Sequence, residues 1–144
     1  MIPTASGDAN PRDRLAALTG AFVDYGLAYP AFVDCAQALM RRSGPELFDE
    51  ISESAIYRLG RAISSCLALL SATLEAGVDS GDFTVDDPEL LANALYASGL
   101  GALQLARVGI LVKEAAPGVP KVAKVSPEQV MDYLVASALA LATR

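Results

Sequence analysis

A nearly unbroken apolar segment, Leu90–Val112, is the sequence feature that most constrains how this chain can fold. It follows Asp87-Pro88-Glu89, which supplies a cap, a first-turn proline and an acidic first turn, and so predicts a helix over residues 87–112. A segment of this length could cross a membrane. Polar side chains, which are expensive in lipid, interrupt it at three positions: Asn93, Gln104 and Arg107. We therefore expect a helix that is buried in a soluble assembly, with no membrane span.

The composition favours helices along the rest of the chain. Hydrophobic residues make up 53% of the 144 residues and aromatic residues only 6%, so the apolar content comes from Ala, Leu and Val. Pro or Gly stands at each junction between periodic stretches, and Ser126-Pro127-Glu128-Gln129 has the pattern of a capping box. The sequence predicts an all-α, antiparallel bundle of about five helices, over residues 11–29, 30–42, 52–80, 87–112 and 126–143. A short helical turn is expected at 46–50, a loop at 115–125, and a disordered leader or a remnant of recombinant expression at 1–10.

Charge and residue usage exclude several classes of function. Seventeen acidic residues against eleven basic ones give a net charge of −6, which repels phosphate backbones. The chain has no histidine, the commonest general base and metal ligand, and it lacks a G-x-S-x-G motif and a glycine-rich phosphate loop. We expect no enzyme activity, no cofactor and no bound metal. No signal peptide is visible, and Cys35 and Cys66 are predicted to be reduced core thiols, as in a cytoplasmic protein.

The helix predicted at 87–112 has two different faces. Its polar side chains gather on one face, which is either a solvent-facing edge or the wall of a mostly apolar ligand cavity. The opposite face carries apolar and small side chains. It packs either against the chain's own core or against a second copy across a two-fold axis. Left uncovered, it would exceed the apolar patch of a typical monomer, so we favour the dimer. Replacing Ala102 by Glu on this face should then split the dimer, because the substitution buries an unpaired charge.

Several stretches resemble the C-terminal domain of TetR-family transcriptional regulators. Residues 15–32, LAALTGAFVDYGLAYPAF, are similar to the helix pair that opens that domain. Residues 74–83, LEAGVDSGDF, followed by DDPELL at 86–91, are similar to the turn between its long ligand-domain helix and its first dimerisation helix. The match extends through Tyr96–Gly109 and the SPEQV motif at 126–130.

The resemblance implies that residues 11–144 form an effector-binding and dimerisation domain. The last two helices would build a homodimer, and a small hydrophobic or amphipathic effector would bind among the earlier helices and the 87–112 helix. In this family, effector binding changes the spacing of the dimer's two DNA-binding domains, and the protein then releases its operator. The resemblance therefore implies a transcriptional repressor. The family's helix-turn-helix would precede residue 11, so DNA contact is expected only through a domain outside this sequence.

The expected ligand-binding residues combine aromatic side chains with hydrogen-bonding groups: Phe22, Tyr25, Tyr57, Asn93, Tyr96, Gln104 and Arg107. Of these, Arg107 would bind an anionic group of the ligand. The expected dimer-interface residues are small or apolar: Leu95, Ala102, Leu105, Ala106, Gly109, Leu134, Ala138 and Leu141. Two competing hypotheses remain. One is a helical protein-interaction module without a ligand pocket, and the other is an enzyme that uses Cys35 or Cys66.

Overall fold

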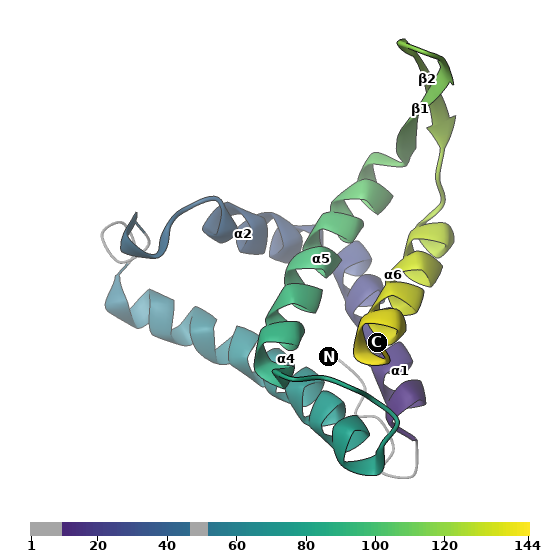
Figure 1. Cartoon of the computed structure of the whole chain (residues 1–144). Coiled ribbons are helices and arrows are strands. Elements are labelled where there is room, and N and C mark those ends of the chain that lie inside the picture. The colour runs from purple at the N-terminus through teal and green to yellow at the C-terminus, as the bar shows by residue number, and fades with distance from the viewer. Residues whose placement is uncertain (1–9, 47–51) are drawn as a thin grey trace.

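The structure, a computed structural model, describes residues 10–46 and 52–144 as a helical bundle with one small sheet (Figure 1). The elements are α1 (Pro11–Ala28), α2 (Pro30–Met40), α4 (Glu53–Ser80), α5 (Pro88–Val108), β1 (Ile110–Ala116), β2 (Val119–Lys124) and α6 (Pro127–Ala142). The all-α prediction is confirmed. The turn expected at 46–50 and the leader expected at 1–10 lie outside the described residues, apart from Glu46 and Asn10.

Local capping determines where the helices start. The Asn10 side chain accepts a hydrogen bond from the Asp13 amide at 2.8 Å, and the Asp87 side chain accepts one from the Leu90 amide at 3.0 Å. Ser126 and Gln129 form the reciprocal bonds of a capping box. A proline occupies the first turn in all three helices, where the missing N–H leaves no bond unmade. The predicted starts at these three positions are confirmed.

Helix α5 lies at the centre of the bundle and packs against α1, α2, α4 and α6. Its inner face is buried along its whole length: Ala92, Leu95, Gly99, Leu100, Leu103 and Ala106. One core cluster gathers around Leu74, Phe83 and Ala138, and a second gathers around Val23, Val33 and Leu134. The prediction of a buried helix is therefore confirmed for one face only. Within residues 10–46 and 52–144, no helix is long and apolar enough to cross a membrane.

The end of α5 and the segment after it differ from the sequence prediction. The helix stops at Val108, because Gly109 takes a left-handed conformation (φ 74°) that ends the helix. Residues 110–116 and 119–124 then form an antiparallel hairpin, where the sequence predicted a continued helix and a loop. The β-branched residues of Ile110–Val112 favour a strand once the glycine has broken the helix. The hairpin extends away from the helices at one end of the molecule (Figure 1).

Two expectations about buried side chains are wrong. Cys35 is exposed, because the inner face of α2 is formed by Val33 and Ala36 and position 35 lies off that face. In α6, the apolar periodicity of the sequence places Leu141 on the buried face with Leu134 and Ala138, but Ala142 is fully buried, whereas Leu141 is 37% exposed. Each error amounts to a rotation of one residue about the helix axis.

Candidate functional site

A small cavity lies among four helices. Its volume is about 40 Å³, room for only a few water-sized groups. Each helix contributes to the lining: Leu18, Thr19 and Phe22 from α1, Cys66, Leu67 and Leu70 from α4, Leu95 and Tyr96 from α5, and Leu134 and Ala138 from α6. The wall is therefore mostly apolar, as ligand pockets for small molecules usually are.

Tyr96, one of the lining residues, carries the most distinctive polar group at the cavity. Its hydroxyl is buried and has no hydrogen-bond partner among the described residues. Burial raises the pKa of the Tyr96 phenol, and the neighbouring Cys66 raises it further. The phenol therefore stays protonated near neutral pH and is available as a hydrogen-bond donor. An unpaired buried hydroxyl costs stability, which a ligand that accepts a hydrogen bond from it would recover.

The other polar groups of the wall are occupied or weak. The Thr19 hydroxyl donates to the Leu15 carbonyl oxygen at 2.8 Å. Burial raises the pKa of the Cys66 thiol, so the thiol stays neutral and is a poor nucleophile. None of the ten residues that line this cavity carries a charge. The arrangement suits a small neutral molecule with one hydrogen-bond acceptor.

Phe22 is held in the wall by close contact with α5. Its ring packs edge-on against the Tyr96 ring, with centroids 5.9 Å apart and planes at 64°. A Cβ at Gly99 would lie 2.6 Å from the Phe22 ring, so only glycine lets the ring approach α5 this closely. The structure thus brings together Phe22 and Tyr96, two of the seven residues expected to bind ligand.

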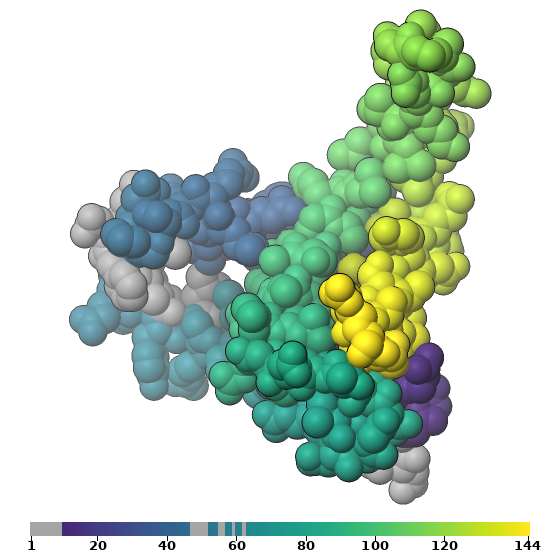
Figure 2. Space-filling view, viewed as in Figure 1, coloured from purple at the N-terminus to yellow at the C-terminus, as the bar shows by residue number. Residues whose placement is uncertain are grey.

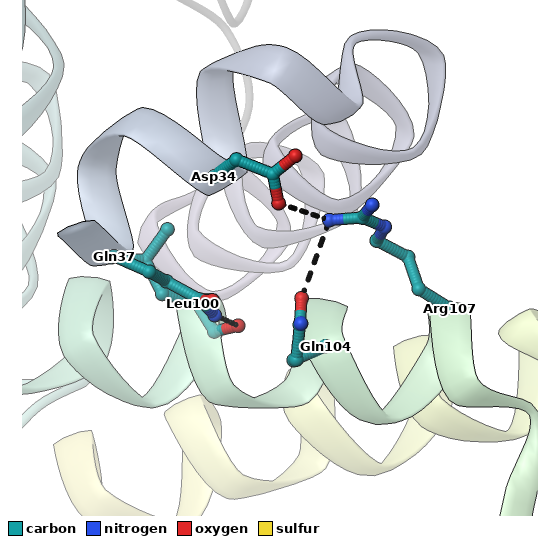
Figure 3. Close-up of polar contacts among 5 residues, drawn as sticks. All are labelled: Asp34, Gln37, Leu100, Gln104 and Arg107. Carbon is teal, nitrogen blue, oxygen red and sulfur yellow. Dashed lines mark hydrogen bonds and ion pairs between the residues drawn. The ribbon is translucent and has the colours of Figure 1, made fainter.

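Arg107 and Gln104 lie elsewhere, in a polar link between α2 and α5 (Figure 3). Arg107 pairs with Asp34 at 2.7 Å and also donates to the Gln104 side-chain oxygen at 3.4 Å. Nearby, the Gln37 amide donates to the Leu100 carbonyl oxygen at 2.9 Å. Neither Arg107 nor Gln104 lines the cavity, so the polar stripe expected on one face of α5 divides between this link and the cavity wall.

Replacing Arg107 by Ala should change stability little. The two side chains of the Asp34 pair are 31% and 62% exposed, and ion pairs in water contribute less than about 1 kcal/mol. Urea denaturation of Arg107→Ala and of the matched variant Asp34→Asn measures the change. A loss of several kcal/mol in both variants would contradict this interpretation and make the link a main stabilising contact.

The remaining expected ligand residues are dispersed. Tyr25 packs against Tyr29 and Phe32, while Tyr57 is 66% exposed and lies under Arg61. Asn93 is exposed, donates to the Glu89 carbonyl oxygen at 2.9 Å and borders a groove of about 310 Å³ between α4 and α5. That groove is larger than the cavity but carries no buried unpaired donor among the described residues, so the cavity is the stronger candidate.

Four of the eight residues expected at a dimer interface are already covered within one chain. Leu95, Ala106, Leu134 and Ala138 are each at most 8% exposed. Ala102 and Gly109 are half-buried, and only Leu105 and Leu141 are exposed. The first four can therefore add little area to an interface between chains.

A different row of residues on α5 is exposed. It is spaced three or four residues apart along one face, and we call it the outer stripe: Leu90, Ala94, Ser98, Gly101, Leu105 and Val108. Helix α6, which packs against α5, exposes Tyr133 and Leu141. A Cβ at Gly101 would meet nothing within 4 Å, so the chain itself leaves this position open. Only Leu105 of this row was among the expected interface residues, because the sequence alone does not tell which side of α5 the chain's own helices cover.

Comparison with known proteins identifies the fold. No family model matches the sequence, and no curated protein matches it. Among solved structures, the chain is similar to a bacterial regulatory protein in the TetR family from Rhodococcus RHA1, with a TM-score of 0.68 and 19% sequence identity. The match covers 94% of this chain and 60% of that protein, so the chain spans about three fifths of its length. The fold expected from the sequence is confirmed: this chain has the fold of a TetR-family regulator.

Proposed function

We propose that this chain is the effector-binding and dimerisation domain of a TetR-like transcriptional repressor. DNA contact would be made by a helix-turn-helix domain outside these 144 residues. The likeness to a TetR-family regulatory protein over 94% of the chain supports this function. The observation that carries it is the apolar cavity with the unpaired Tyr96 hydroxyl, because a buried donor without an acceptor suits a ligand better than it suits a core.

The outer stripe supports dimerisation. Six small or apolar side chains in one exposed row would remain in water in a single chain, and a second copy would cover them. Small residues such as Ala94, Ser98 and Gly101 let two helices approach closely. A two-fold pairing through α5 and α6 places the same surface of both chains in contact.

The cavity and the proposed dimer surface share α5 and α6, which provides a route from effector binding to dimer geometry. Leu95 and Tyr96 come from α5, and Leu134 and Ala138 come from α6. A cavity of about 40 Å³ is too small for most organic ligands, so binding of an effector would require the lining helices, α5 and α6 among them, to move apart. An effector that fits the expanded form shifts the population toward it, and with it the spacing of the two subunits.

Tyr96→Phe tests the ligand class. The probes are acetophenone, which carries one acceptor oxygen, and ethylbenzene, which has a similar shape and none. Both should raise the melting temperature of the wild-type chain, because binding to the native state stabilises it. The variant should bind acetophenone roughly 2- to 10-fold more weakly, the equivalent of one hydrogen bond, and ethylbenzene equally well. Titration calorimetry gives the two affinities.

The variant Thr19→Val is the matched control, because it also removes a hydroxyl from the cavity wall but one that is already bonded to Leu15. Equal losses for both probes in Tyr96→Phe would contradict a role for the hydroxyl. Failure of every apolar compound to bind the wild-type chain would favour the protein-interaction module without a ligand pocket.

A further inference from the structure

The hairpin of β1 and β2 is an ordered arm that projects beyond the helices (Figures 1 and 2). At its base, the Val125 amide donates to the Gly109 carbonyl oxygen at 3.0 Å. At its tip, Gly118 adopts a positive φ of 77°, and its amide donates to the Glu114 side chain at 2.7 Å. Local bonds thus fix both ends of the hairpin. Nearly all residues of the two strands are exposed, and a two-stranded hairpin without a covering surface is marginally stable at best in water.

The two faces of the hairpin both favour a partner. On one face, Val112 pairs with Val122, and the two side chains are 78% and 62% exposed. On the other face, Lys113 lies directly opposite Lys121. Like charges at opposed positions destabilise a hairpin. An acidic surface against this face would convert the repulsion into attraction.

The charge of the hairpin is opposite to that of the rest of the chain. All three lysines of the sequence lie in it, at 113, 121 and 124, and with Glu114 they give a formal charge of +2. Because the whole chain carries −6, the remaining residues carry −8. The most acidic segment is residues 79–89, which we call the acidic turn. It joins α4 to α5 and contains no basic residue: Asp79, Asp82, Asp86, Asp87 and Glu89.

The hairpin and the acidic turn lie at opposite ends of α5. The helix has 21 residues, a length of about 31 Å, so the two segments of one chain cannot meet. Two copies paired through the outer stripe with their α5 helices antiparallel would bring each hairpin to the partner's acidic turn. A parallel pairing would place two basic hairpins side by side, which their charge disfavours.

We propose that the hairpin is a dimerisation arm, whose lysines and exposed valines dock on the acidic turn of a second copy in an antiparallel α5 pairing. This inference rests on the dimer of the proposed function. It adds the relative orientation of the two subunits, and it identifies the partner's acidic turn as the surface that contacts the hairpin. The complementary charges make assembly sensitive to salt, since surface attraction is screened as ionic strength rises.

Charge reversal with rescue tests the arm. In Lys113→Glu/Lys121→Glu, the two opposed side chains keep their mutual repulsion but reverse their sign. Sedimentation equilibrium at low ionic strength should show dimerisation weakened at least about tenfold. Adding Asp79→Lys/Asp86→Lys should restore most of the affinity, because attraction returns with the signs exchanged. These two aspartates are chosen because, unlike Asp87, neither caps a helix.

Arg12→Glu/Arg58→Glu is the matched control, since it makes the same change in net charge at two exposed positions outside the hairpin. It should leave dimerisation within about twofold of wild type. Circular dichroism of every variant checks that the helices are retained. Two results would contradict the role of the hairpin in dimerisation without contradicting the dimer itself. One is unaltered dimerisation in the charge-reversed variant, and the other is weakened dimerisation that the rescue does not restore.

Two further outcomes would also overturn it. A wild-type chain that is monomeric at all concentrations would remove the arm together with the proposed dimer. Hairpin-dependent binding to duplex DNA or to anionic phospholipid vesicles, with dimerisation unaffected by charge reversal, would assign the lysines to a polyanion instead.

Discussion

Gly101→Glu should convert the proposed dimer into a folded monomer. Gly101 lies near the middle of the outer stripe, and in an antiparallel pairing the two copies of this position approach each other closely. The substitution would bury two like charges at the interface. An uncompensated buried charge costs about 3–5 kcal/mol, which weakens dimerisation at least about 100-fold. Sedimentation velocity over a range of concentrations measures the change.

The single chain should tolerate this substitution. Gly101 is exposed, and a Cβ there would meet nothing within 4 Å. Replacing a mid-helix glycine also favours the helix by up to about 1 kcal/mol. This makes Gly101 a cleaner position than the half-buried Ala102, which packs against the chain's own core. The control is Gly60→Glu, an exposed glycine of α4 that also has open space around it. A dimer that survives Gly101→Glu would place the interface elsewhere.

Gly26 and Leu103 should behave as a coupled pair at the contact of α1 with α5. A Cβ at Gly26 would lie 2.4 Å from a methyl carbon of Leu103, whose side chain is fully buried. Gly26→Ala alone overpacks the contact and should cost about 1–3 kcal/mol. Leu103→Ala alone leaves a cavity and should cost about 2–5 kcal/mol. In the double variant, the added methyl group occupies part of the space that the leucine vacates.

The double variant should therefore lose less stability than the two single losses combined, by about 1 kcal/mol or more. Urea denaturation of the wild type, the two single variants and the double variant completes this double-mutant cycle. Gly20→Ala with Leu103→Ala is the control pair, because a Cβ at Gly20 has only the Met131 sulfur nearby, at 3.9 Å. That pair should be additive. Additivity at Gly26 and Leu103 would mean that the two helices separate to relieve the contact.

Sequence reasoning succeeded where a feature is local. The helix starts follow from Asn10, Asp87 and Ser126, each of which bonds to an amide three residues ahead. The hairpin was missed because Pro120 interrupts a strand of only six residues. Two sequence features could have predicted the hairpin: Gly109, which ends the helix, and Pro117-Gly118, which forms the turn. The apolar residues that continue past Gly109 favoured a longer helix instead.

The site depends on contacts that no local pattern encodes. Phe22 and Tyr96 were expected together, but Thr19 and Cys66 were not, since they line the cavity only because of how α1 and α4 are rotated against α5. Arg107 was expected to face a ligand and instead meets Asp34, 73 residues away in the chain. A helical wheel gives the residues that share a face. The packing of neighbouring helices decides which face is covered.

Along α5, positions that line the cavity alternate with positions of the outer stripe: Leu95 and Tyr96 face inward, and Ala94 and Ser98 face outward. One helix diameter, about 10 Å, separates the two surfaces. In the proposed effector-binding domain, substitutions at inward positions would change which effector binds, while the outward positions would keep the same dimer contact. A movement of α5 on effector binding would reach the proposed dimer surface within the same helix, with no loop in between.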